Sequence, residues 1–232
     1  MVCIFEFFYL CSRNNNKMKI VSVITGDIIG STLGNDSQRR KMLDLIEGSV
    51  DEIQNELVLR LQLEFFRGDA FQILIEKPEK ALLVAILLRA ALCGDTPKDN
   101  LYVWDARMAI GVGGVKYRTD SLAKSNGDAF IYSGRTLDGM WNERLAIKTQ
   151  WKTINDEFSV STPFADDLIS HWTRVQASVI YDYLLYDVPQ GQIAREKGMS
   201  PQNVSKVLKA GRTELIINYI KRFEKLIYDK SY

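Results

Sequence analysis

The order of apolar patterns along residues 19–145 is the feature that most constrains the fold of this chain. Residues 19–25 (KIVSVIT) are rich in β-branched side chains, which is typical of a buried strand. Residues 36–57 instead place apolar side chains three or four positions apart, which predicts a helix. Residues 59–76 hold two alternating runs that are broken at Gly68, so we expect a hairpin there.

The next segment continues the alternation of helix and strand. Residues 78–92 form an apolar helix pattern that opens with Pro78, whose missing N–H costs nothing in the first turn. Residues 105–115 (DARMAIGVGGV) predict a strand, and residues 127–145 predict a further helix. The resulting order, β-α-β-β-α-β-α, predicts an α+β fold with a ferredoxin-like βαββαβ core, in which an antiparallel sheet carries helices on one face.

The pattern is weaker beyond residue 145. We expect further strands at residues 146–154 (AIKTQWKTI) and 157–162 (EFSVST), followed by a short helix at 163–172. From Thr173 onward the spacing of apolar residues is helical throughout, which predicts an all-α segment at the end of the chain.

Charge divides the chain near residue 170. The whole sequence has 30 basic and 29 acidic side chains, and this balance argues against binding of a polyanion by the whole chain. Residues 171–232, however, hold ten basic and six acidic side chains, a formal charge of +4, which leaves −3 for the rest of the +1 total. We therefore expect an α/β domain at residues 18–160 and a basic helical domain at 171–232.

The first 17 residues need a separate interpretation. The run MVCIFEFFYLC lacks a basic n-region and is too short to span a bilayer, so residues 1–17 are interpreted as a leader or a mis-called start before Met18. The alternative is an extra edge strand or a partner-binding flap. No other segment is apolar enough to cross a membrane, and three scattered cysteines fit a reducing cytoplasm.

Two aspartates stand at the ends of strands that we expect to be neighbours. Asp27 ends the first strand, and Asp69 lies in the hairpin turn, so both carboxylates could reach one hard cation such as Mg²⁺ or Mn²⁺. Backbone N–H groups of the segment after Asp27 could hold phosphate oxygens. The candidate residues of that segment are Ile28, Gly30, Ser31 and Thr32. The alternative is that Asp27 is only a cap and Asp69 only part of a turn.

Four segments, GDIIGST, FRGDAFQILIE, RMAIGVGGV and GDAFIYSGRTLDGM, follow one another in the order of the class III nucleotidyl cyclase motifs. Residues 19–145 resemble that family. The resemblance implies that Asp27 and Asp69 bind a pair of metal ions and that Arg135 contacts the triphosphate. Such metal ions activate the ribose 3′-hydroxyl and neutralise the leaving pyrophosphate.

Two positions depart from the family pattern. Phe65 stands where the family has a base-selecting Lys or Glu, and Ile131 stands where it has a transition-state Asn. Loss of a positioned polar donor typically lowers the rate by about 10²–10³. The resemblance thus implies a degenerate cyclase-like domain that binds a nucleotide or dimerises, rather than an active cyclase.

Residues 192–211 (QIAREKGMSPQNVSKVLKAG) predict a second functional unit, a helix-turn-helix. Gly198 predicts the turn, Ser200 caps the second helix, and Pro201 opens it. The polar face of that helix carries side chains of the types that contact bases and phosphates. These are Gln202, Asn203, Ser205, Lys206 and Lys209. The segment resembles the helix-turn-helix of sigma-factor region 4, while the plain alternative is a helical hairpin.

The sequence therefore predicts a cytoplasmic, homodimeric, DNA-binding transcriptional regulator with a degenerate cyclase-like domain. The order of the two units also resembles the SatD family of bacterial proteins. The alternative is a divalent-metal-dependent nucleotide cyclase or nucleotidyltransferase-like enzyme that acts on a nucleoside triphosphate. A third possibility is that the helix-turn-helix contacts another protein, such as RNA polymerase. His171 and Cys93 are interpreted as packing residues.

Overall fold

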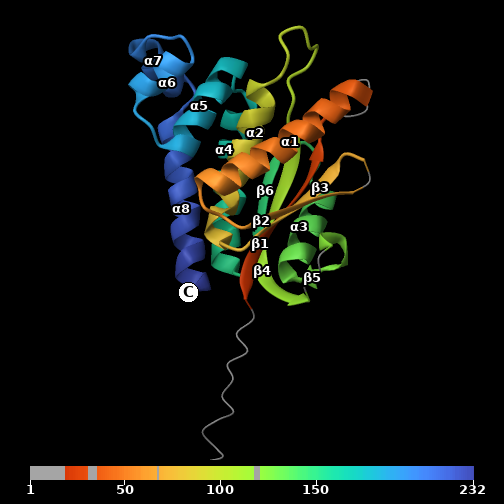
Figure 1. Cartoon of the computed structure of the whole chain (residues 1–232). Helices are drawn as coiled ribbons and strands as arrows, with labels where there is room; N and C mark the ends of the chain where they lie inside the picture. Colours follow the sequence, from red (N-terminus) through yellow and green to blue (C-terminus); the bar gives the residue numbers. More distant parts are fainter. Residues whose placement is uncertain (1–18, 31–35, 67, 118–120) are drawn as a thin grey trace, which may run out of the picture.

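The computed structural model describes residues 19–30, 36–66, 68–117 and 121–232 (Figure 1). The interpretation of residues 1–17, and the phosphate contacts expected of Ser31 and Thr32, lie outside the described residues.

A six-stranded mixed sheet forms the centre of the molecule (Figure 1). Four strands lie side by side in the order β2-β3-β1-β4, and each neighbouring pair is antiparallel. β5 pairs with the end of β4, and β6 runs parallel to β4. The strands are β1 (Ile20–Ile28), β2 (Leu61–Phe66), β3 (Ala70–Ile75), β4 (Ala106–Tyr117), β5 (Asn126–Gly127) and β6 (Leu145–Thr149). The strands and the hairpin predicted before residue 116 are thereby confirmed.

Helices cover both faces of this sheet. α1 (Asp36–Glu56) and α2 (Ala81–Gly94) share one apolar cluster with Ile24 of β1, whereas α3 (Asp128–Gly139) shares a second cluster with Val21 and Val23. Successive side chains of a strand point to opposite faces, so the two clusters lie on opposite sides. The expectation that all helices would cover one face was therefore wrong.

Gly111 of β4 explains how closely α3 approaches the sheet. A Cβ atom at Gly111 would lie 2.1 Å from the carbonyl oxygen of Ala129 and 2.5 Å from the backbone nitrogen of Ser133. A residue with any side chain would force α3 away from the sheet, so glycine fixes this packing distance.

Residues 152–170 form one helix, α4 (Lys152–Ser170), so the strand expected at EFSVST was wrong. Ile154, Phe158, Ala165 and Ile169 are buried along one side of α4, and this spacing is helical. Pro163 lies inside this helix. The strand expected at residues 146–154 is confirmed only for β6, which ends at Thr149.

The remaining helices pack against the first part of the chain (Figure 1). They are α5 (Arg174–Tyr186), α6 (Gln190–Glu196), α7 (Pro201–Ala210) and α8 (Thr213–Ser231). The described residues also include the short 3₁₀ helices η1 (Pro78–Lys80) and η2 (Leu122–Lys124). α8 lies along α4 and η1, where Tyr219 and Thr162 share a 2.7 Å hydrogen bond and Lys80 donates to Glu224 at 2.8 Å. One hydrophobic cluster includes side chains of α2, α4, α5 and α8. None of the helices in the described residues has the length and apolar composition needed to span a bilayer.

Candidate functional site

The structure brings the two predicted metal ligands to one cavity. Asp27 lies near the end of β1 opposite Ala70 of β3, and the backbone N–H of Ile28 donates to the carbonyl oxygen of Asp69 at 3.2 Å. Asp27 and Asp69 both line a cavity of about 570 Å³ between the sheet and α3. Its other walls include Phe66, Gln72, Leu122 and Phe130.

Asp27 also has an ion-pair partner that the sequence analysis missed. Arg107 lies opposite Asp27 on β4, and its guanidinium donates from Nε to Oδ1 at 3.0 Å and from Nη2 to Oδ2 at 2.5 Å. This pair raises the pKa of Arg107 through the hydrogen bonds to the carboxylate. The sequence did place Arg107 at the start of a strand that we expected in the sheet. It did not predict the strand register that aligns Arg107 with Asp27.

The donor set does not fit a divalent metal ion. Both oxygens of Asp27 accept hydrogen bonds from Arg107, so a cation would have to displace this guanidinium. Among the described residues, no group of three or more His, Cys, Asp and Glu side chains gathers in a way that could hold a metal ion. We therefore derive no chemical step through a metal at Asp27 and Asp69.

Arg135 does not share the cavity with the two aspartates. It is exposed on α3, while Gly134, Leu137 and Asp138 of the same helix line the cavity. Arg135 is therefore not placed beside Asp27 and Asp69, and a contact with a triphosphate there stays a prediction.

A second cavity, of about 420 Å³, lies on the other side of Asp27. It is lined by Asp27, Arg107, Trp141, Asn142, Arg144 and the backbone segment Ile28–Gly30. Two of the predicted phosphate-binding residues, Ile28 and Gly30, therefore lie here together with two arginines. Gly30 adopts a positive φ of 73°, and its carbonyl oxygen accepts from the hydroxyl of Tyr102 at 3.2 Å.

A buried network of charges fixes Arg144 at the wall of this cavity. Arg89 of α2 is 1% exposed and donates to both oxygens of Asp105, at 2.9 and 2.8 Å, and to Asp166 of α4 at 2.6 Å. The guanidinium of Arg144 donates to Asp105 at 2.9 Å, and its backbone N–H donates to Asp166 at 2.8 Å. Burial alone would raise the pKa of Asp105, but the charge and hydrogen bonds of Arg89 outweigh it and lower this pKa.

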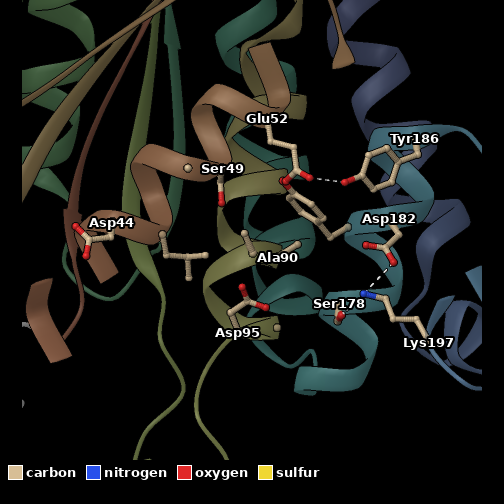
Figure 2. A pocket seen from close by; sticks show the side chains of 14 residues that line it. Asp44, Ser49, Glu52, Ala90, Asp95, Ser178, Asp182, Tyr186 and Lys197 are labelled. Carbon is tan, nitrogen blue, oxygen red and sulfur yellow. Dashed lines mark hydrogen bonds and ion pairs between the residues drawn. The ribbon is translucent and has the colours of Figure 1, made fainter. Parts of the chain in front are cut away.

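A third cavity, of about 300 Å³, lies where α1 and α2 meet α5 and the segment after α6 (Figure 2). Glu52 of α1 accepts a 2.5 Å hydrogen bond from Tyr181 and a second hydrogen bond from Tyr186. Lys197 donates to Asp182 at 2.9 Å and to Ser178 at 2.8 Å. These contacts join the first part of the chain to the segment that precedes α7.

α6 and α7 form a tight pair of helices joined by a turn. Gly198 adopts a positive φ of 63°, and the hydroxyl of Ser200 accepts from the backbone N–H of Asn203 at 3.2 Å. Val204 and Leu208 of α7 are buried. The five predicted DNA contacts, Gln202, Asn203, Ser205, Lys206 and Lys209, are all exposed.

Comparison with solved structures shows a weak likeness to a nucleotide cyclase. The crystal structure of the guanylyl cyclase Cya2 is similar to this chain with a TM-score of 0.41 and 16% sequence identity, over 55% of this chain and 74% of that chain. A likeness of this strength identifies neither a family nor an activity. No protein-family model and no curated protein matches the sequence.

Proposed function

We propose that this chain is a DNA-binding transcriptional regulator that contacts DNA through α7. The main support for this proposal is the amphipathic character of α7. Five polar or basic side chains of this helix are exposed, whereas Val204 and Leu208 are buried. Among the described residues, the side chains of Gln202, Lys206 and Lys209 have no hydrogen-bond or ion-pair partner, so they are available to a ligand. In helix-turn-helix proteins the second helix of such a pair lies in the major groove.

In this proposal the first part of the chain senses an anionic ligand of nucleotide type or forms a homodimer. The strand order β2-β3-β1-β4, with antiparallel neighbours throughout, supports a ferredoxin-like core. The contacts of Glu52 with Tyr181 and Tyr186 support a mechanical link between that core and the helices before α7.

The DNA-binding proposal is tested by fluorescence anisotropy with labelled genomic fragments over a series of salt concentrations. We expect log Kd to depend on log salt, and the double substitution Lys206→Ala/Lys209→Ala to reduce the slope by about 0.9 for each lost phosphate contact. The matched control is Lys221→Ala/Lys225→Ala, which removes the same charge from exposed positions of α8.

Two results would contradict the proposal. One is binding that does not respond to salt or to the α7 substitutions. The other is an absence of DNA binding together with a stable complex with core RNA polymerase, which would assign α7 to a protein partner instead.

The second candidate is the divalent-metal-dependent enzyme acting on a nucleoside triphosphate. One observation favours it, since Asp27 and Asp69 line the same cavity. The ion pair between Asp27 and Arg107 opposes it. Incubation with each nucleoside triphosphate and Mg²⁺ or Mn²⁺ tests this candidate: it requires a product that disappears in Asp27→Asn, and no turnover with any of them rejects it.

A further inference from the structure

We propose that the cavity between Asp27 and Arg144 binds a phosphate-type oxyanion through two arginines and without a divalent metal ion. This inference rests on the ligand-sensing part of the proposed function. It assigns the anion contacts to Arg107 and Arg144, neither of which was singled out from the sequence. The sequence analysis expected a divalent metal ion at Asp27, whereas in this inference the guanidinium of Arg107 occupies that carboxylate.

The guanidinium groups of Arg107 and Arg144 line the same cavity, and each has N–H donors beyond those it uses in hydrogen bonds to the described residues. A guanidinium has five N–H donors. Among the described residues, Arg144 donates one side-chain hydrogen bond, to Asp105, and Arg107 donates two to Asp27 and one to the carbonyl oxygen of Met140. Their side chains are 38% and 33% exposed, so the remaining donors are accessible from the cavity. A planar guanidinium can donate two parallel hydrogen bonds to one phosphate group, which strengthens binding and fixes the orientation of the phosphate.

The charge of the cavity wall favours an anion. Its charged residues are two arginines and one aspartate. Arg107 already neutralises Asp27, so a metal ion is not needed to overcome repulsion between this carboxylate and an incoming phosphate. The carboxylate that touches Arg144, Asp105, is itself paired through both oxygens with Arg89.

The buried network makes Arg144 a preorganised donor. Asp105 orients its guanidinium, and Asp166 holds its backbone N–H. Asp105 and Asp166 are in turn anchored by Arg89, which is almost fully buried. A donor fixed in this way loses little conformational freedom when an anion binds. Arg89, Asp105 and Asp166 are thus positioning residues for Arg144.

The test is isothermal titration calorimetry of the full chain with sodium pyrophosphate, and separately with ATP, in excess EDTA and in excess Mg²⁺. We expect both probes to bind in EDTA. Arg144→Gln and Arg107→Gln should each weaken binding by at least tenfold, which corresponds to the loss of one charge-assisted interaction. Arg60→Gln is the matched control, because it removes the same charge from an exposed position before β2 that does not line the cavity, and it should leave binding unchanged.

Asp27→Asn separates this inference from the metal-dependent candidate. We expect the variant to keep or increase its affinity in EDTA, since Arg107 gains donors when the carboxylate charge is removed. A metal-dependent site would instead lose binding both in EDTA and in Asp27→Asn.

Circular dichroism of each variant confirms that it is folded before titration. The inference is overturned if neither probe binds in EDTA, if binding requires Mg²⁺, or if Arg60→Gln weakens binding as much as folded Arg144→Gln or Arg107→Gln. The same preparations are assayed for DNA binding, so a failure of the anion site with intact DNA binding removes this inference and leaves the role of α7 standing.

Discussion

Arg89 shows how single charged residues hold this fold together. Its guanidinium is buried and bonds to Asp105, Asp166 and Ser170. These partners precede β4 or lie on α4, so one side chain connects three elements that are far apart in the sequence. A buried charge is tolerated only when it is paired and hydrogen-bonded, and this network meets both conditions.

Arg89→Met should therefore be strongly destabilising. It removes the guanidinium that pairs with two buried carboxylates, and among the described residues Asp105 keeps only Arg144 as an ion-pair partner. Loss of one member of a buried ion pair costs about 3–5 kcal/mol. Urea unfolding followed by circular dichroism measures the change. Adding Asp166→Asn to Arg89→Met should recover part of the loss, because the carboxylate charge that Arg89 had paired is then gone.

The exposed ion pair between Lys152 and Asp156 supplies the control for that experiment. Lys152→Met should leave the unfolding free energy unchanged, because solvent screens this pair. If Arg89→Met had no larger effect than Lys152→Met, the network would not be a structural anchor.

Asp182 should make stability depend on pH. Burial raises the pKa of its carboxyl, and Lys197 opposes this rise only in part. Because the folded-state pKa lies above the unfolded value, the stability that Asp182 contributes is present below the unfolded pKa and is lost as the pH rises through the folded pKa. The other charged groups that influence it are Glu52 and Glu196.

Asp182→Asn removes this titration. The difference in unfolding free energy between the variant and the wild type should shift in favour of the variant as the pH rises from acidic to neutral. Urea unfolding at a series of pH values measures the shift, and a difference that is constant with pH would show that Asp182 does not titrate as described.

Some residues of the candidate site could be predicted from the sequence, and others could not. Asp27 and Asp69 were identified because they end adjacent strands, which depends only on the order of elements. Arg107 and Arg144 were missed because their roles depend on partners that come close only in the folded sheet, at a separation of 80 residues for Arg107 and Asp27. No local pattern indicates such a pair.

At the level of elements, local signals decided which predictions were accurate. α7 has a Ser cap, a Pro at its first position and a Gly turn before it, all within four residues, and its bounds were accordingly predictable. α4 has no side-chain cap and contains Pro163, and its β-branched residues resemble a strand pattern. Its helical state follows from the burial of Phe158 against Tyr219 and Phe223 of α8, which is a tertiary contact.

The cap of α7 should contribute measurably to the stability of this element. Ser200→Ala removes the oxygen that accepts from the backbone N–H of Asn203, and loss of such a cap typically costs about 1 kcal/mol. Urea unfolding measures the cost. Ser200→Asp, which keeps an oxygen acceptor at this position, should retain most of the wild-type stability, and equal stability of Ser200→Ala and wild type would contradict a capping role.

At the level of the whole molecule, the division of charge near residue 170 does not coincide with a division of the core. Side chains of α8 share one hydrophobic cluster with α2 and α4. The ion pairs of Lys80 with Glu224 and of Glu157 with Arg222 also cross this boundary. The charge pattern describes which surface each part presents, whereas the packing of apolar side chains determines which parts unfold together. Whether residues 18–160 and 171–232 are separate domains therefore depends on whether they unfold independently, which can be measured.

Phe223→Ala tests whether the chain unfolds as one unit. Phe223 is fully buried and packs edge-to-face on Phe158 of α4 at a ring-centroid distance of 5.5 Å. Removal of such a ring typically costs about 3–5 kcal/mol. Because this contact joins α8 to the first part of the chain, we expect hydrogen exchange to become faster in β1 and β3 as well as in α8. Faster exchange confined to α5–α8, with β1 and β3 as protected as in the wild type, would instead show two independently stable domains with a boundary near residue 170.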